Sequence, residues 1–247
     1  MLNHYRYTSV ETQAEALALN VAKTIKLILE RKNFEQQNHN ASVLTDHYSL
    51  EKTAPNSIKL AVSGGKSPRL FLEKLSCIDL DWSRIEILLV DDRWVDVTHT
   101  DSNFRFIENT LKQNAAINAR LWPLIDLKRN PNEQAKLLST SKMPGLPDIA
   151  ILGMGDDGHT ASLFADAPEW ENAINTDYFY VAVSPVAAAH SRISLSLSAL
   201  KKIEFLFLQF AGESKSTVFN QALHKPSRNA ISLLLADQPR NLDVYSC

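Results

Sequence analysis

Residues 58–75 read IKLAVSGGKSPRLFLEKL, an apolar run followed by a glycine-rich turn and then by a helical pattern. The run Ile58–Val62 predicts a buried strand, and Ser67–Leu75 predicts a helix with Pro68 near its first position, where the missing N–H does no harm. Two adjacent glycines leave the backbone N–H groups of the turn free to face an anion. A tight strand-to-helix turn that needs glycine for shape alone would have the same sequence. We therefore treat the segment as a strand–turn–helix unit with a candidate phosphate loop.

Further apolar runs alternate with helical patterns along the rest of the chain. They predict strands over Ile85–Val90, Ile149–Leu152, Tyr178–Val183, Ile193–Leu197, Phe205–Phe210 and Ile231–Leu235. A helix is predicted for Ser102–Gln113. Because short apolar strands separated by helices are typical of parallel sheets covered on both faces, we expect an α/β fold with a mostly parallel sheet.

The first part of the chain predicts one long helix. Residues 8–11 (TSVE) have the pattern of a capping box. The apolar residues that would share one face of the following helix are Leu17, Val21, Ile25 and Ile28. We expect this helix to end near Asn33, and the polar segment Phe34–Ser57 to be a loop with one short element at most.

Composition narrows the class of protein. The 247-residue chain has 26 Lys and Arg against 28 Asp and Glu, so no basic field favours nucleic-acid binding. Cys77 and Cys247 lie far apart without a CxxC spacing, which favours a reduced, cytoplasmic protein. No run approaches the roughly eighteen apolar residues of a membrane span. The length allows one large domain or two closely packed lobes, and we take residues 1–247 as a single domain.

Glycine is rare and unevenly placed. Of seven glycines, six fall in three short segments, which are residues 63–68, 153–160 and 212–215. Each segment follows an apolar run, which puts all three at the carboxyl ends of predicted strands. Ligands of parallel sheets bind at that edge. We therefore expect three loops to form one site, and we interpret it as a site for a phosphorylated sugar.

The second glycine segment contains a histidine in a catalytic context. His159 lies between the glycine-rich turn and a helix-like run, and Asp157 stands two positions before it. A histidine placed there can act as a general base on water, with the carboxylate orienting the imidazole. An isolated Asp-x-His is more often a helix cap with a solvent-facing aspartate. Three glycines in six residues reverse that preference.

Basic residues near the first and third glycine segments are candidates for anion binding. Arg192 begins an alternating strand, and Lys215 falls in the first turn after a strand, where a cation opposes the helix dipole. Lys66 lies in the first glycine loop itself. It directly follows Gly65, and the same loop contains the hydroxyl donor Ser63. Taken singly, Arg192 and Lys215 are equally well explained as ordinary surface cations.

Asp91-Asp92-Arg93 at the end of a buried strand is the fourth candidate element. Adjacent residues of an extended chain point to opposite sides, so we expect one of the two carboxylates to be structural. Arg93 would pair either with Asp92 or with a substrate oxygen. The remaining histidines show neither HxxxH nor HExxH spacing, so we expect no metal site. No GxSxG elbow favours a serine nucleophile.

Four motifs in order resemble 6-phosphogluconolactonases of the stand-alone type, in the glucosamine/galactosamine-6-phosphate isomerase superfamily. They are residues 60–68 (LAVSGGKSP), residues 90–95 (VDDRWV) with the later Ser102-Asn103, residues 153–164 (GMGDDGHTASLF) and residues 212–215 (GESK). The likeness extends over about residues 58 to 236. It implies a Rossmann-like α/β fold of the sugar-phosphate deaminase/isomerase kind, and hydrolysis of 6-phosphoglucono-δ-lactone in the oxidative pentose phosphate pathway without a cofactor.

The resemblance also implies roles for individual residues. His159 matches the general base of the family, Asp157 its acidic neighbour, and Arg93 the active-site arginine. Arg192 and Lys215 match the residues associated with phosphate, and Ser63, Gly64 and Gly65 match the sugar-phosphate loop. The chain departs from the usual motifs at Asp92, Ser67 and Ala165, where Glu, Thr and Pro are more common, and none of these changes removes a reacting group.

Two other functions fit parts of the pattern. A glucosamine-6-phosphate deaminase would share the fold and the first loop, but that family continues its Asp-Gly-His segment with Asn-Glu-Pro, whereas residues 160–166 here read TASLFAD. A non-catalytic phosphosugar sensor would usually come with a DNA-binding helix-turn-helix. The residues before the first predicted strand contain one clear helix and no basic recognition element.

Overall fold

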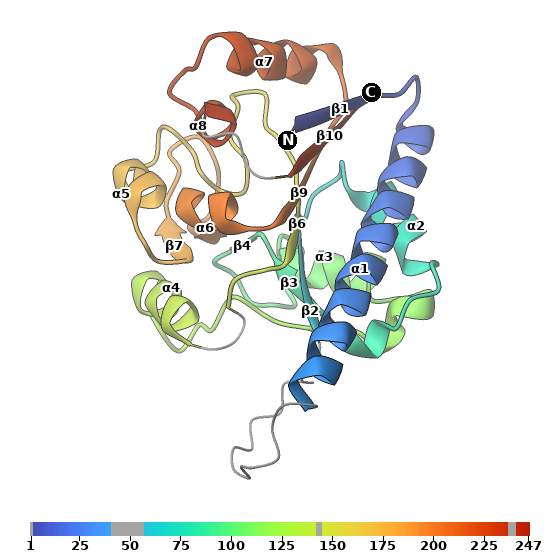
Figure 1. Ribbon diagram of the computed structural model, residues 1–247. Helices are drawn as coiled ribbons and strands as arrows, with labels where there is room; N and C mark the ends of the chain where they lie inside the picture. The colour runs from blue at the N-terminus through green and yellow to red at the C-terminus, as the bar shows by residue number, and fades with distance from the viewer. Residues whose placement is uncertain (1, 41–56, 142–144, 237–240) are drawn as a thin grey trace.

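The computed structural model describes residues 2–40, 57–141, 145–236 and 241–247, and its framework is a seven-stranded parallel sheet (Figure 1). In spatial order the strands are β1 (Leu2–Arg6), β10 (Leu242–Ser246), β9 (Phe205–Phe210), β6 (Ile149–Leu152), β2 (Ile58–Val62), β3 (Ile85–Leu89) and β5 (Arg120–Leu121). Every neighbouring pair is parallel. Since β1 pairs with β10, the two ends of the described chain lie side by side (Figure 1).

The central strands are buried on both faces, as their continuous apolar sequences require. Helices α1 (Val10–Asn40) and α2 (Arg69–Ser76) cover one face, and α5 (Trp170–Asn175), α6 (Leu197–Lys202) and α8 (Ala230–Ala236) lie on the other (Figure 1). The other helices are α3 (Asn103–Thr110), α4 (Pro131–Thr140) and α7 (Glu213–His224), with 3-10 turns at Trp82–Arg84 and Asn114–Asn118. The expected α/β fold with a mostly parallel sheet is confirmed. Within the described ranges, no helix is both long and apolar enough to cross a membrane.

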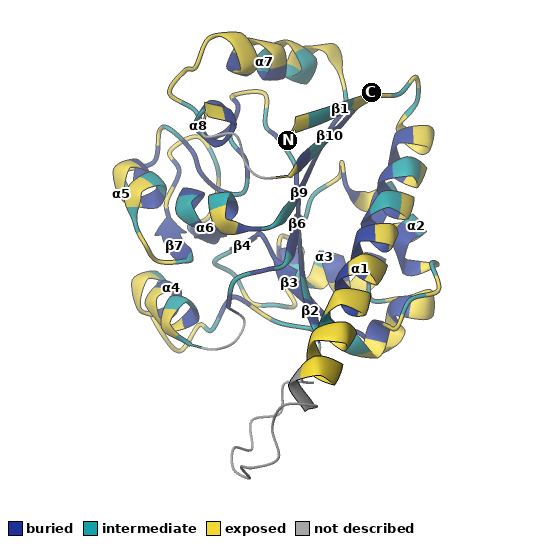
Figure 2. Cartoon of the chain, viewed as in Figure 1, coloured by how far each residue is buried: buried dark blue, intermediate teal, exposed yellow. Residues whose placement is uncertain are grey.

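Helix α1 begins where the sequence predicts but ends later. The Oγ of Ser9 accepts the N–H of Thr12, so Ser9 is the cap in place of the expected box over residues 8–11. The predicted apolar face is confirmed, because its four members are fully buried. The predicted end near Asn33 is wrong, since the helix continues to Asn40, and residues 33–38 are exposed (Figure 2). Good helix formers such as Glu and Gln extend a helix into solvent without a buried face. Residues 41–56 of the expected loop lie outside the described residues.

Several predicted elements match the observed ones at both ends or differ by one residue. The predicted strands β2, β6 and β9 agree at both ends, and β3 ends one residue early. Pro68 is the N-cap of α2, one position before the expected one. Ser102 caps α3, because its Oγ accepts the N–H of Arg105 at 3.3 Å.

A second sheet lies at the carboxyl ends of the central strands. It is antiparallel and consists of β4 (Asp91–Arg93), β8 (Arg192–Leu195) and β7 (Tyr180–Val183), in that order. Two of these strands were expected from their apolar runs, but as members of the parallel sheet. Strand β4 follows β3 with only Val90 between them, and the carbonyl of Val90 accepts the N–H of Leu195. The small sheet therefore continues from the main sheet above the edge where ligands bind.

The predicted strand Ile231–Leu235 is wrong, because these residues form helix α8. The side chain of Asn229 accepts the N–H of Ser232 at 2.9 Å and starts the helix. Ile231, Leu234 and Leu235 are all buried, and a short apolar run of this kind fits a buried helix turn as well as a strand. The strand at this end of the chain is β10, which the sequence analysis did not predict.

Candidate active site

A cavity of about 250 Å³ opens at the carboxyl ends of the central strands, beside the second sheet. Residues of all three glycine segments line it, together with residues of β4 and β8. The predicted site residues that line it are Ser63, Gly64, Gly65, Lys66, Arg93, His159, Arg192 and Lys215. Asp157 does not line it but contacts His159. The structure therefore brings the residues that the sequence singled out into one place.

His159 and Asp157 form a tight pair in the loop after β6. The Nδ1 atom of His159 lies 2.6 Å from Oδ1 of Asp157, which also accepts the backbone N–H of His159 at 3.1 Å. The hydrogen bond from the imidazole holds the pKa of the Asp157 carboxyl below its usual value. Because that carboxylate is ionised at neutral pH and can only accept, Nδ1 carries the proton and Nε2 of the neutral ring is a free base.

Gly155 and Phe164 hold the imidazole in place from two sides. The ring of His159 stacks on that of Phe164, with 4.0 Å between the centroids. On the other side, a Cβ at Gly155 would overlap the imidazole, so only glycine leaves room for this rotamer. The turn also uses Gly158 at φ +78°, where a residue with a side chain would be strained.

Two arginines face the cavity from adjacent strands. Arg93 and Arg192 are direct cross-strand partners in the second sheet, an arrangement that like charges disfavour. Arg192 is buried, and that burial lowers the pKa of its guanidinium, against the opposing effect of nearby Asp91. Its guanidinium also lies 5.2 Å from the ring centroid of Phe164. Two cations paired across adjacent strands, one of them buried, favour an anion beside them.

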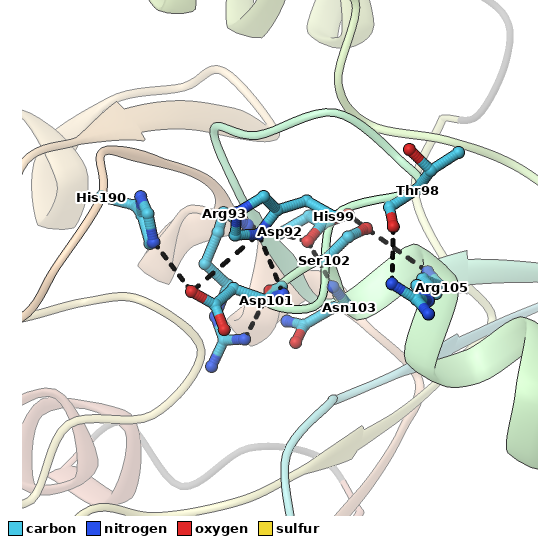
Figure 3. Close-up of polar contacts among 9 residues, drawn as sticks. All are labelled: Asp92, Arg93, Thr98, His99, Asp101, Ser102, Asn103, Arg105 and His190. Atoms are coloured by element: carbon cyan, nitrogen blue, oxygen red, sulfur yellow. Dashed lines mark hydrogen bonds and ion pairs between the residues drawn. The ribbon is translucent and has the colours of Figure 1, made fainter.

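Backbone carbonyls from two loops orient these arginines. Arg93 Nη1 donates to the carbonyl of Asp101 at 2.7 Å, and Arg192 Nη1 donates to that of His190 at 3.2 Å. The side chains of Asp101 and His190 bind each other at 3.0 Å (Figure 3). Bonding to His190 keeps the pKa of Asp101 low. The two loops that hold the arginines are thus joined to each other.

Asp91 and Asp92 have different surroundings, as their alternation on a strand predicts. Asp92 is buried and accepts the backbone N–H groups of Arg93, Asn103 and Phe104, so it caps α3 and is structural. Burial nevertheless raises its pKa to about 6, because desolvation outweighs those hydrogen bonds. Asp91 lines the cavity, and one of its oxygens accepts the hydroxyl of Ser162 at 2.5 Å.

The first glycine loop presents backbone more than side chains to the cavity. Both the N–H and the hydroxyl of Ser63 bond to the carbonyl of Ile151, so this hydroxyl is not free to donate to a ligand. Gly65 has φ +101°, and a Cβ at Gly64 would overlap the side-chain amide of Asn103. Lys66 is exposed at the rim.

Lys215 reaches the cavity from the first turn of α7. Gly212, the N-cap of that helix, has φ +101° and turns the chain there. Among the residues that the structure describes, the Lys215 ammonium has no ion pair, which leaves its charge available to a ligand. In the same described part of the chain, no three His, Cys, Asp or Glu side chains gather closely enough to hold a metal ion.

The lining also includes residues that were not predicted as site residues, among them Asn103, Ser162 and Phe164. Asn103 and the other two lie within stretches that the motifs had already marked, but residue type gave no reason to select them. Ser162 is placed by a hydrogen bond to the distant Asp91, Asn103 by a bond to the carbonyl of Asp91, and Phe164 by stacking on His159 within the same segment.

Comparisons with known proteins identify relatives of this chain. The 6-phosphogluconolactonase of Neisseria meningitidis serogroup A is 38% identical over 192 residues, which cover 75% of this chain and 83% of that protein. The 6-phosphogluconolactonase of Helicobacter pylori strain 26695 is 36% identical over 192 residues, covering 77% of this chain and 84% of the relative.

Solved structures superpose over the whole chain. A 6-phosphogluconolactonase from Shewanella baltica has a TM-score of 0.82 at 28% identity, with 100% of this chain and 98% of the other covered. A Neisseria gonorrhoeae protein gives 0.85 at 33% identity, with coverages of 100% and 99%. The family model described as glucosamine-6-phosphate isomerases/6-phosphogluconolactonase matches residues 13–242. The chain therefore belongs to the glucosamine-6-phosphate isomerase/6-phosphogluconolactonase family.

Proposed function

We propose that the chain hydrolyses 6-phosphoglucono-δ-lactone to 6-phosphogluconate, a step of the oxidative pentose phosphate pathway. One observation supports this most strongly: an imidazole oriented by a carboxylate shares a cavity with two arginines, of which Arg192 is buried, and with a lysine that has no ion pair among the described residues. That combination supplies a base for water and a cationic surface for a phosphate. The curated relatives named above have the same activity in their names.

The imidazole is proposed to act as the general base. Nε2 of His159 takes a proton from water while the water oxygen bonds to the lactone carbonyl carbon. The carbonyl becomes an oxyanion, which Arg93 and the N–H groups of the glycine loop stabilise. The bond from this carbon to the ring oxygen then breaks, and the ring oxygen takes the proton back from Nε2. The new carboxylic acid ionises and releases one proton per turnover.

Asp157 is proposed to act through His159. Its carboxylate accepts from Nδ1 and so keeps the lone pair on Nε2, and it stabilises the imidazolium that forms in the reaction. General base catalysis of this kind typically contributes about 10²–10⁴-fold to the rate.

The phosphate is proposed to lie between Arg192, Lys215 and the first glycine loop. Charge-assisted bonds to a phosphate fix the far end of the lactone and thus hold the reacting carbon near His159. Lys66 at the rim would add attraction on entry. We also propose that residues 1–247 act as one domain, because strands from both ends of the chain are neighbours in the sheet.

The function is tested with two substrates and two readouts. Purified protein receives 6-phosphogluconolactone or glucosamine 6-phosphate, and proton and ammonia release are followed with spontaneous hydrolysis subtracted. We expect proton release from the lactone well above background and no ammonia from the amino sugar. Ammonia release from glucosamine 6-phosphate would show that the chain is a deaminase and that the proposed lactonase activity is wrong.

A variant then tests the base. His159→Asn should retain the fold but lose about 10²–10⁴-fold of the enzymatic rate. A variant with an unchanged rate would show that another group activates the water.

A further inference from the structure

Two polar atoms beside the cavity are buried without a hydrogen-bond partner among the described residues. They are Oδ1 of Asn103 and Nε of Arg93, and both residues line the cavity. Asn103 as a whole is 3% exposed. A buried acceptor left unpaired costs about 1–3 kcal/mol, so such atoms are rare in native proteins and each calls for an explanation.

The orientation of the Asn103 side chain is determined by its other contacts. Its Nδ2 donates to the carbonyl of Asp91 at 2.8 Å, and a carbonyl can only accept. The assignment of nitrogen and oxygen is therefore unambiguous, and Oδ1 is the atom that faces the space beside Gly64. A Cβ at Gly64 would overlap this oxygen, so only glycine leaves room for the Asn103 amide here.

Arg93 and Asn103 are held by the same carboxylate oxygen. The backbone N–H of Arg93 donates to Oδ1 of Asp92 at 2.8 Å, and that of Asn103 donates to it at 2.6 Å (Figure 3). Arg93 has Nη1 engaged by the carbonyl of Asp101, which leaves its Nε free. One carboxylate thus anchors the backbone of two cavity-lining residues, one with an unpaired donor and the other with an unpaired acceptor.

A hydroxyl group fits this pair, because it donates one hydrogen bond and accepts another. We propose that Asn103 is a specificity-determining residue whose Oδ1 accepts a hydrogen bond from one ring hydroxyl of the sugar lactone, while Nε of Arg93 donates to the oxygen of that hydroxyl. This inference rests on the proposed function. A site built to bond a hydroxyl rejects an analogue without it, because the buried polar atoms are then left unpaired.

Monodeoxy substrates test the assignment. The 2-deoxy, 3-deoxy and 4-deoxy forms of 6-phosphogluconolactone are compared with the parent lactone by kcat/KM, for the wild type and for Asn103→Ala. We expect the wild type to disfavour one of the three by about 10- to 100-fold. In Asn103→Ala that discrimination should fall to about twofold, while the kcat/KM ratios of the other two deoxy forms to the parent lactone stay as in the wild type.

The discrimination factor separates specificity from structure. If Asn103 only supported the fold, the variant would lower kcat/KM for all four lactones equally and leave every ratio unchanged, which would overturn the proposal. Should Asn103→Ala fail to fold, Gly64→Ala tests the same contact. The added Cβ would displace Oδ1 of Asn103, and the side chain can move because a single hydrogen bond, from Nδ2 to the carbonyl of Asp91, holds its amide.

The kinetics of the wild type alone provide a further test of the proposal. If it hydrolyses the parent lactone but treats all three deoxy forms within about twofold, the hydroxyl contact does not exist and the proposal is wrong. If it does not hydrolyse the parent lactone, the proposed function itself fails. Water held at the same atoms would produce the first of these results.

Discussion

Replacement of Gly155 by alanine perturbs the proposed base without touching a reacting group. The added Cβ would lie 2.6 Å from Oδ1 of Asp157 and closer still to Nδ1 of His159. Ordinary contacts of carbon with such atoms need about 3.5 Å or more, so the imidazole must leave its position against Phe164. The backbone at Gly155 does not have a positive φ, so alanine itself is accepted there.

The expected loss follows from the displacement of the base. General base catalysis is worth about 10²–10⁴-fold, or about 3–5 kcal/mol of transition-state stabilisation. We expect Gly155→Ala to lose kcat within this range while KM changes only a few-fold, because the phosphate contacts are elsewhere. The free energy of unfolding should change by about 1 kcal/mol or less, since the clash is with movable side chains.

Gly153→Ala is the matched control. It lies in the same loop, also without a positive φ, and its Cβ would have no heavy atom within 4 Å. Proton release at constant pH gives kcat and KM for both variants, and denaturant unfolding gives their stability. The reasoning would be refuted if Gly155→Ala retained its rate to within about threefold, or if Gly153→Ala lost as much.

Three further predictions address neighbouring groups. Asp157→Asn should lower kcat by about 10²-fold or more with little change in KM, because an amide can donate to Nδ1 and so place the proton on Nε2; an unchanged kcat in steady-state assays would contradict this. Asp92 has a folded-state pKa of about 6 against 3.8, so the folded state binds more protons between these values and its stability falls as pH rises. Relative to Asp92→Asn, the wild type should therefore lose up to about 3 kcal/mol of unfolding free energy from pH 4 to pH 7. If denaturant titrations show the same free-energy difference between the two proteins at every pH, the raised pKa of Asp92 is wrong. Lys215→Met should raise KM for the lactone and the inhibition constant of 6-phosphogluconate by about 10- to 100-fold, more than it lowers kcat; equal binding at low salt would show that the lysine does not contact phosphate.

Local sequence was sufficient for the strand–turn–helix units. The strands Ile58–Val62, Ile149–Leu152 and Phe205–Phe210 were predicted at both ends, because a run buried on both faces has no polar alternation to blur it. The glycines that follow them mark turns whose shape depends on the absence of a side chain. Since the carboxyl ends of parallel strands share one edge of the sheet, the sequence alone allowed us to expect that these loops converge.

Short apolar runs and edge strands could not be assigned in this way. Residues 231–235 have no periodicity that separates a strand from a helix turn, and the choice came from capping by Asn229 and from burial around α8. Strand β1 is partly exposed and lies at the edge, so its sequence lacks the continuous apolar signal.

The chain by itself determined which residue types could perform the chemistry: a histidine and an aspartate in a glycine turn, two arginines near strand ends, and a lysine after a strand. Only the tertiary structure decided which of two adjacent aspartates faces the cavity, that Arg93 and Arg192 lie opposite each other, and that Asn103 leaves its oxygen unpaired. The physical reason is that these features depend on hydrogen bonds and strand pairings between segments up to about a hundred residues apart. Local propensity carries no record of such partners, whereas burial makes each of them obligatory once the segments meet.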